Sequence, residues 1–164
     1  MERSLTLGVM MILFLACAGF HGYAADYYVD IESGPGSHSG TVADPFQDIG
    51  DATAVVTAGD RIHVATGTYV ETVTVPDDVS IFGGYASDFS IRNPSLYPSV
   101  INGSDAPVVV QAAGRIELDG LGITHGGTGV YGNAADGSSI IACEFSYLYG
   151  EDGATGASGT PGDN

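Results

Sequence analysis

The sequence predicts an all-β fold built as a solenoid, a parallel β-helix, and three observations support it. An apolar pattern within residues 115–124 recurs 22 residues later. The matched pairs are Leu118 with Ile140, Leu121 with Cys143, and Ile123 with Phe145. After residue 61, short apolar or alternating segments end at Gly, Pro or Asp, as strands do, and only one earlier stretch carries helix signals. Segments this short bury their apolar face only when copies stack in register. The repeat therefore favours a β-helix of about 22 residues per coil over a sandwich.

Residues 1–24 are predicted to form a secretory signal peptide. Arg3 precedes an apolar run from Leu5 to Phe20, and small residues lie before a cleavage site after Ala24. A retained membrane anchor is the alternative, but the run has 16 residues, whereas a spanning helix needs about 20. We expect a secreted or cell-surface protein with no membrane span after cleavage. Cleavage leaves Cys143 as the sole cysteine, which predicts no internal disulfide and a buried, unreactive thiol.

Residues 25–60 are expected to form an N-terminal strand and a capping helix. The strand is predicted at 26–31, where aromatic and β-branched residues cluster. The helix is predicted from Pro45 to Val56, with Asp44 as its N-cap, Gln47 completing a capping box and Gly59 supplying a left-handed stop. Its apolar face would consist of Phe46, Ile49, Thr53 and Val56. We expect this face to cover the strand edges of the first coil, which would otherwise invite aggregation.

Residues 61–149 are expected to form the β-helix coils. Strands are predicted at 61–65, 69–75, 79–82, 100–101, 108–111, 116–118 and 121–124. Between them, residues 86–99 contain two prolines and no sustained period, which predicts a loop that projects from one coil.

Residues 150–164 carry a glycine at every third position, from Gly150 to Gly162. A collagen triple helix needs many more such triplets and more proline, so this small polar segment predicts a flexible Gly-rich loop. It shows no capping element. We therefore expect the chain to be the N-terminal fragment of a longer solenoid.

Four segments carry a family resemblance: PFQDIGDA, AGDRIHVATGTYVE, FGGYASDFSIRNPSLYPSVINGS and LDGLGITHG. They resemble the N-terminal part of secreted bacterial right-handed parallel β-helix proteins of the pectin-lyase-like superfamily, which includes polymorphic outer-membrane proteins and extracellular domains of unknown function. The resemblance covers residues 26 to about 150. It implies the fold more than an activity, because the superfamily includes lyases, hydrolases, epimerases, tailspikes and non-catalytic adhesins.

The charge of the chain argues against two classes of partner. Twenty acidic residues stand against four arginines and no lysine, which gives a formal net charge of -16. Nucleic acids and anionic membranes are bound through Lys and Arg, so neither is an expected partner. The acidity favours solubility and leaves a cation site open.

Known cofactor motifs fail in this sequence. Residues 127–132 match GxGxxG, but a turn follows them where the dinucleotide fold needs a helix. A calcium repeat that starts at Gly126 would need Asp at its sixth position, where Tyr131 stands. Asp119 and Asp136 are isolated acids that would bind calcium only together with further coils. We predict no cofactor, and the metal question stays open between calcium and none.

The sequence also shows no recognisable group of catalytic residues. Lyases with the resembled fold use Arg or Lys as a base near acid-bound calcium, and hydrolases use clustered aspartates. Arg61, Arg92 and Arg115 show no carboxylate cluster around them in the sequence, and Asp77-Asp78 has the setting of a tight turn. The histidines His38, His63 and His125 lack metal-site spacing, and His63 is expected to point away from the core. The sequence predicts no catalytic residue.

These observations predict a non-catalytic extracellular or cell-surface β-helix module with a structural or adhesion role. Its loops, especially 86–99 and 149–164, would contact surface glycans or other proteins. The alternative is the N-terminal part of a carbohydrate-active enzyme, a lyase, hydrolase or epimerase, whose groove lies in coils beyond this sequence. The pattern leans against an enzyme and leaves the ligand and the oligomeric state open.

Overall fold

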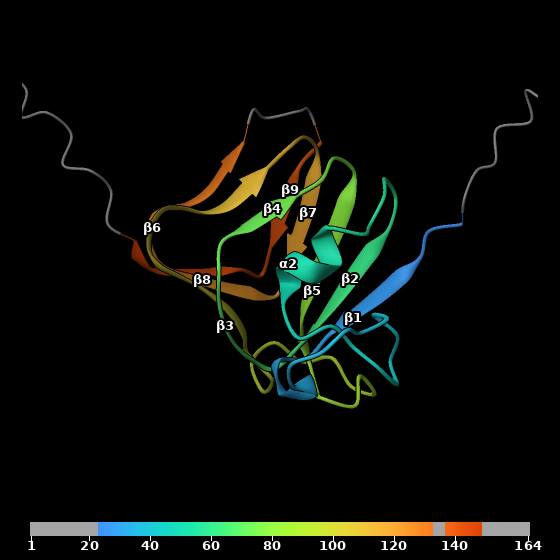
Figure 1. Ribbon diagram of the computed structural model, residues 1–164. Helices are drawn as coiled ribbons and strands as arrows, with labels where there is room; N and C mark the ends of the chain where they lie inside the picture. Colours follow the sequence, from blue (N-terminus) through green and yellow to red (C-terminus); the bar gives the residue numbers. More distant parts are fainter. Residues whose placement is uncertain (1–22, 133–136, 149–164) are drawn as a thin grey trace, which may run out of the picture.

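The protein is all-β and consists of parallel sheets. Its computed structural model describes residues 23–132 and 137–148. The first sheet has the strand order β1-β2-β5-β7-β9, and the second has the order β10-β8-β6-β3, with β4 also paired to β6 (Figure 1). The strands are β1 (Asp26–Val29), β2 (Arg61–Ala65), β3 (Gly67–Val70), β4 (Val73–Val75), β5 (Val79–Tyr85), β6 (Ser99–Ala112), β7 (Ile116–Asp119), β8 (Leu121–Gly132), β9 (Ser139–Ile141) and β10 (Glu144–Leu148). Between β1 and β2 lie a 3-10 turn, η2 (Ile31–Ser33), and one α-helix, α2 (Ile49–Thr53).

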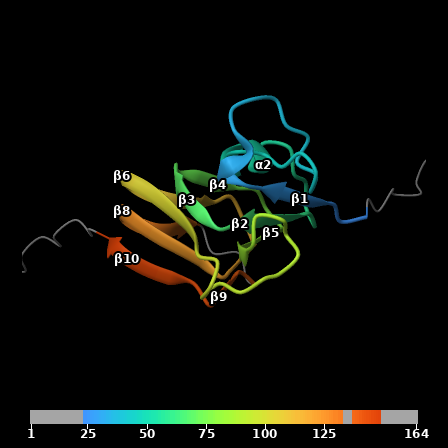
Figure 2. The same ribbon diagram turned by 90° about the horizontal axis from the view of Figure 1, so that it is seen from below.

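The strand register contains the 22-residue offset that the sequence predicts. Leu118 pairs with Ile140 between β7 and β9, and Ile123 pairs with Phe145 between β8 and β10. The same offset joins Ser99 of β6 to Leu121 of β8. Figure 2 shows β6, β8 and β10 stacked in chain order. The 22-residue offset therefore relates β6 to β8, β7 to β9 and β8 to β10, whereas β5 and β7 are paired at a longer offset, as Ile81 with Leu118.

The long strands of the second sheet bend sharply in the middle. In β8 the bend is at His125, whose φ is 52°. In β6 the ladder shifts its register between Asn102 and Ala106. β3 pairs with β6 before this shift and β4 pairs with it afterwards, so each long strand contributes to two differently oriented faces.

The core lies between the inner faces of the sheets. In the inner strands, alternate residues are fully buried there, among them Ile62, Ile81 and Leu118 of the first sheet and Ile101 and Ile123 of the second. Each such side chain contributes about 1.5–3 kcal/mol on burial. Tyr69 is the largest fully buried residue, and its hydroxyl donates to the carbonyl of Ala65 at 3.0 Å, which satisfies its polar end. Burial raises the pKa of this hydroxyl above its ordinary value.

The capping helix is shorter and starts later than the sequence predicts. α2 begins after Asp48, not after Asp44, and its first two amides donate to the carboxylate of Glu71 at 2.8 Å each. Phe46 is extended: its amide donates to Tyr28 and its carbonyl accepts from Asp30, so it adds a bridge to the edge of β1. Pairing with a strand distant in sequence outcompetes the local capping box.

The position of α2 agrees with its expected covering role. Ile49 and Ala52 are fully buried, Val56 is 8% exposed, and the helix contacts β1 and β4. In Figure 2, α2 lies at the end of the stack opposite β10. Thr53, expected on the apolar face, is half-buried and donates from its hydroxyl to the carbonyl of Gly50.

The loop of residues 86–98 does not project, contrary to the sequence prediction. Arg92 bridges to Tyr85 in antiparallel fashion, and the Asn93 amide donates to the carbonyl of Gly84 at 2.6 Å. The loop therefore folds back on the end of β5. Ile91 and Leu96 remain exposed at its surface.

Several sequence predictions fall outside the described residues. They concern most of the signal peptide of residues 1–24, Asp136, and the Gly-rich segment of residues 150–164. Among the residues that are described, no helix has the length and apolarity needed to cross a membrane.

Candidate functional site

An aromatic column lies on the outer face of the first sheet, where the pleat places it. Tyr28, His63 and Phe82 are register partners on β1, β2 and β5. Their neighbours Ile62 and Ile81 are buried in the core, so these three side chains point the other way. We call the set formed by Tyr28, His63, Phe82, Tyr85 and Phe89 the outer aromatic cluster.

The rings of the outer aromatic cluster are stacked on one another. The His63 ring lies 5.1 Å from that of Tyr28 and 5.9 Å from that of Phe82, with interplanar angles of 22° and 25°. Tyr85 meets His63 edge-on at 5.1 Å, and Phe89 of the 86–98 loop meets Tyr28 edge-on at 5.0 Å. Such pairs contribute about 0.5–1.5 kcal/mol beyond burial. The cluster is thus a second, external apolar layer that holds the loop on the sheet.

His63 links the cluster to polar groups on both of its ring nitrogens. Nε2 lies 2.8 Å from Oδ1 of Asp26, and Nδ1 lies 2.9 Å from the hydroxyl of Tyr85. Burial raises the pKa of the Tyr85 hydroxyl. With both nitrogens engaged and 15% of its side chain exposed, His63 has no ring nitrogen left for a substrate or a metal ion. It points away from the core, as its alternation with Ile62 and Val64 predicts.

Arg92 joins the loop to β5 and β7. Its guanidinium carbon lies 5.6 Å from the Phe82 ring centroid and 5.8 Å from that of Tyr85. Nε donates to the carbonyl of Gly83, Nη2 donates to the carbonyl of Asp119 at 3.1 Å, and the same Nη2 lies 3.0 Å from the Asp119 carboxylate. The sequence does not indicate this partner, because Asp119 lies 27 residues further along the chain.

The other two described arginines also face aspartates. Arg61 lies 3.8 Å from Asp26, and Arg115 pairs with Asp78. Both pairs are about half exposed, so each contributes little to stability. The amide of Arg115 donates to Asp77 at 2.7 Å, and Asp78 has a φ of 60°, which agrees with the turn expected for this acidic pair.

A polar groove of about 330 Å³ lies on the same outer face, beside the Arg115–Asp78 pair. Ser80 donates to Glu117 within it at 3.0 Å. Its lining thus combines one guanidinium with two carboxylates, of which Asp78 is tied to Arg115. Among the described residues, no three His, Cys, Asp or Glu side chains are placed to hold a metal ion.

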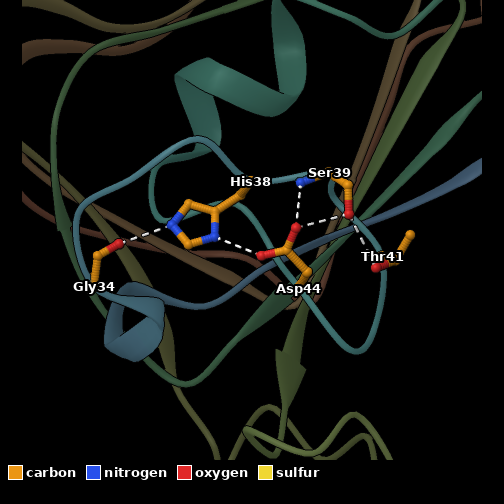
Figure 3. A network of polar contacts seen from close by, with 5 residues as sticks. All are labelled: Gly34, His38, Ser39, Thr41 and Asp44. Atoms are coloured by element: carbon orange, nitrogen blue, oxygen red, sulfur yellow. Dashed lines mark hydrogen bonds and ion pairs between the residues drawn. The ribbon is translucent and has the colours of Figure 1, made fainter.

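A second polar cluster contains the residue types of a catalytic triad but not its geometry (Figure 3). Nδ1 of His38 lies 2.8 Å from Asp44, and its Nε2 lies 2.9 Å from the carbonyl of Gly34. Ser39 bonds to Asp44 through both its amide and its hydroxyl, at 2.8 and 2.9 Å, and makes no hydrogen bond to His38. A nucleophilic serine would need the histidine nitrogen as its base. The arrangement instead closes the loop before α2.

The charges in this loop cluster support each other. The hydrogen bond to Asp44, followed by that to Gly34, raises the pKa of His38. The hydrogen bonds from His38 and Ser39 lower the pKa of Asp44. Because both ring nitrogens face oxygen acceptors, only the protonated imidazole donates to both.

The remaining sequence candidates are dispersed over the described residues. His125 stacks on Tyr147 at 5.1 Å, far along the chain from His38 and His63, so the three histidines contribute to different surfaces. The GxGxxG match at residues 127–132 forms the second half of β8. Cys143 is half-buried and its thiol pKa is raised by burial, which agrees with an unreactive thiol.

The sequence reveals part of the outer aromatic cluster, because it predicts that His63 points outward. The residues that surround His63 were missed, since Asp26 and Tyr85 lie 37 and 22 positions away in the chain. The alternation of aromatic with buried residues in β1, β2 and β5 is the signal that would have indicated a column.

Comparisons with protein-family models, curated proteins and solved structures find no match to this chain. The class that the fold defines is therefore the broad one, an all-β protein made of parallel sheets.

Proposed function

We propose that this chain is a right-handed parallel β-helix module of an extracellular or cell-surface protein, with a structural or adhesion role and without catalysis of its own. The observation that carries the proposal is the 22-residue register between β6 and β8, β7 and β9, and β8 and β10. A chain that advances by one strand spacing per repeat, always in parallel, is what a solenoid requires.

The pairing of the bent strands supports the same architecture. One repeat passes from β5 through the two halves of β6 to β7, and the next passes from β7 through the two halves of β8 to β9. Each of these segments pairs with its counterpart in the neighbouring repeat. The two sheets thus supply three faces per turn, with apolar residues inside.

The state of the charged groups supports a non-catalytic role. His38 and His63 have both ring nitrogens engaged by structural partners, and Arg92 is bound to Gly83 and Asp119. A general acid or base needs a lone pair or a proton that faces the substrate. These groups instead fasten loops to the sheets. The predicted signal peptide supports export.

The proposed contact surface is the 86–98 loop together with the outer aromatic cluster beneath it. Ile91 and Leu96 are 55% and 64% exposed there, and the rings below them fix the loop. Surface glycans or proteins are the partners proposed for it, because an acidic molecule is a poor ligand for nucleic acids or anionic lipids.

The test is incubation of the secreted chain with uronate polysaccharides and calcium. We expect no unsaturated product absorbing in the ultraviolet, and affinity electrophoresis in gels containing the same polysaccharides reports binding without cleavage. Formation of an unsaturated or hydrolysed product would overturn the non-catalytic proposal.

The polar groove favours a second candidate, the N-terminal part of a carbohydrate-active enzyme. Arg115, Asp78 and Glu117 line this groove, and arginine and carboxylates are the groups that lyases and hydrolases employ. If the groove is catalytic, Arg115→Ala and Glu117→Gln abolish product formation while the neighbouring Arg61→Ala does not.

A further inference from the structure

Ala25, just before β1, is tied to the fold through its backbone. Its carbonyl accepts from the amide of Arg61 at 2.9 Å, and its own amide donates to Oδ1 of Asp60 at 2.7 Å. The two residues before it, Tyr23 and Ala24, are exposed, and neither makes a hydrogen bond to another described residue. The chain therefore leaves the surface of the molecule at the bond between Ala24 and Ala25.

This bond coincides with the cleavage site that the sequence predicts. Gly22 and Ala24 are the small residues expected before the cut, and they follow the apolar run of the predicted signal peptide. A peptidase cuts segments that are accessible and make few contacts, and Tyr23 is 99% exposed. Removal of Tyr23 and Ala24 would cost the described fold no hydrogen bond.

Asp60, which accepts the Ala25 amide, is a buried carboxylate with 5% of its surface exposed. Its second oxygen, Oδ2, accepts from the amide and the hydroxyl of Thr57 at 2.8 and 3.0 Å. Burial acts to raise the pKa of Asp60, but the hydrogen bonds from Ala25 and Thr57 outweigh it and hold this pKa below its ordinary value. Asp60 is thus a buried negative charge whose three donors are all neutral in the uncut chain.

The side-chain cations of the chain are engaged elsewhere. The sequence has no lysine. Among the described residues, no arginine or histidine forms an ion pair with Asp60, and each arginine lies beside another aspartate: Arg61 beside Asp26, Arg92 beside Asp119 and Arg115 beside Asp78. A buried carboxylate without a cation is costly. An α-ammonium group at Ala25 would supply the cation that the side chains do not.

Cleavage by a peptidase of the export machinery turns the Ala25 amide into that ammonium. Water adds across the Ala24–Ala25 peptide bond: its oxygen enters the new carboxylate of Ala24, and both of its protons go to the nitrogen of Ala25. That nitrogen already lies 2.7 Å from Oδ1 of Asp60. The existing hydrogen bond therefore becomes a charge-assisted one, which is shorter and stronger than a neutral bond.

The other charges on the elements around Ala25 are already paired. Asp26 on β1 and Arg61 on β2 lie 3.8 Å apart. Asp78, whose carbonyl accepts from the turn that contains Asp60, pairs with Arg115. Asp60 is therefore the carboxylate that a new amino terminus meets.

We propose that Asp60 is a receptor for the amino terminus that signal-peptide cleavage creates at Ala25, so that processing places a buried ion pair between the start of β1 and the turn before β2. The uncut precursor lacks this ion pair, and the fold gains it only after processing. This inference rests on the export proposed above, but it uses no part of the proposed contact surface.

The first experiment treats the secreted chain with an amine-acylating ester and measures its intact mass. Because the sequence has no lysine, the α-amino group is the sole primary amine after cleavage, so the mass gives both the cut site and the extent of labelling. We expect a chain that begins at Ala25 and whose α-amino pKa lies above its ordinary value of about 8.

Substitution of the receptor tests the ion pair directly. Asp60→Asn should raise the rate of acylation at pH 7 at least about tenfold, because a nearby opposite charge commonly moves a pKa by about 1 or more. Asp105→Asn is the matched control. It makes the same change at an exposed acid of β6, in the other sheet, and should leave the rate unchanged.

A second measurement changes no side chain and does not depend on how well a variant folds. A chain that starts one residue earlier, at Ala24, has its amino group outside the Asp60 site and an amide again at Ala25. It should be acylated at least about tenfold faster at pH 7 than the chain that starts at Ala25, and it should unfold at a lower urea concentration. Retention of residues 1–24, a cut at another bond, or equal acylation rates for the two chains would each overturn the proposal. Cleavage of uronate polysaccharides would overturn the non-catalytic role and leave this proposal intact, so the two fail independently.

Discussion

At the scale of single residues, His38 shows how one side chain can order a loop that has no regular structure. Its ring joins Asp44 to the carbonyl of Gly34, six and four positions away. Asp44 in turn accepts two bonds from Ser39. The hydrogen bonds, more than burial, set the protonation of the pair, so its stability should depend on pH.

The first prediction concerns this pH dependence. The folded pKa of His38 is raised, so its contribution is complete below the ordinary value of 6.5 and is lost as pH rises through the folded pKa. The folded pKa of Asp44 is lowered, so its contribution is complete above 3.8 and is lost as pH falls through the folded pKa. The loop should therefore be most stable between these two ordinary values.

The measurement is an NMR titration of the His38 ring in the native chain and in Asp44→Asn. In the native chain the midpoint should lie above 6.5, and in Asp44→Asn it should return toward that value. An unchanged His38 midpoint would contradict the assigned hydrogen bond.

At the scale of elements, the N-terminus of α2 depends on a residue outside the helix. Glu71 lies between β3 and β4, and its carboxylate accepts hydrogen bonds from the first two amides of α2. Glu71 therefore fills the capping role that the sequence predicts for Asp44. Burial raises its pKa, although both hydrogen bonds act to lower it. Because the folded pKa of Glu71 is raised, the free energy of unfolding falls as pH rises through that pKa. The two amides at the start of α2 nevertheless still need an acceptor.

The second prediction separates these two effects of Glu71. Glu71→Ala leaves two helix amides without their acceptor and should cost about 1–3 kcal/mol at pH 7. Glu71→Gln keeps an acceptor oxygen without a buried charge, so it should cost less and show a weaker loss of stability as pH rises. Urea unfolding at pH 4 and pH 7 measures both variants. Equal costs for Ala and Gln would show that Glu71 does not act as the cap.

The third prediction concerns the loop of residues 86–98. Arg92→Ala removes the stacking on Phe82 and Tyr85 and the bonds to Gly83 and Asp119, so the loop should detach from the sheet. Hydrogen exchange and limited proteolysis within residues 86–98 should then rise several-fold. Arg92→Lys should restore only part of the protection, because an ammonium lacks the planar fork. Arg61→Ala removes a distant, half-exposed pair and should change neither measurement.

Some elements are predicted from the sequence and others are not, because some depend on local patterns and others on contacts between residues distant in the chain. Strands such as β2 and β7 are predicted because alternation with the core is a local pattern. The start of α2 and the path of the 86–98 loop are not predicted, because each depends on a contact between residues distant in the chain. Phe46 pairs with β1, and Arg92 pairs with Asp119. The outer aromatic cluster is partly predicted, through the outward direction of His63. Its partners belong to other strands, and a single local pattern does not connect them.

At the scale of the whole molecule, the stacked register makes stability depend on position along the axis. Ile81, Leu118 and Ile140 are successive register partners on β5, β7 and β9. The first two are fully buried, with strands on both sides, whereas Ile140 is 48% exposed. In the proposed solenoid, repeats contact only their neighbours, so the loss of a side chain is felt by one or two repeats.

The fourth prediction follows from this gradient. Ile81→Ala and Leu118→Ala should each cost about 2–5 kcal/mol, whereas Ile140→Ala should cost less than about 1 kcal/mol in dilute solution, because the site is already open to water. Urea unfolding of the three variants at low concentration measures the gradient. Equal costs at all three positions would contradict the expected dependence of stability on burial along the proposed stack.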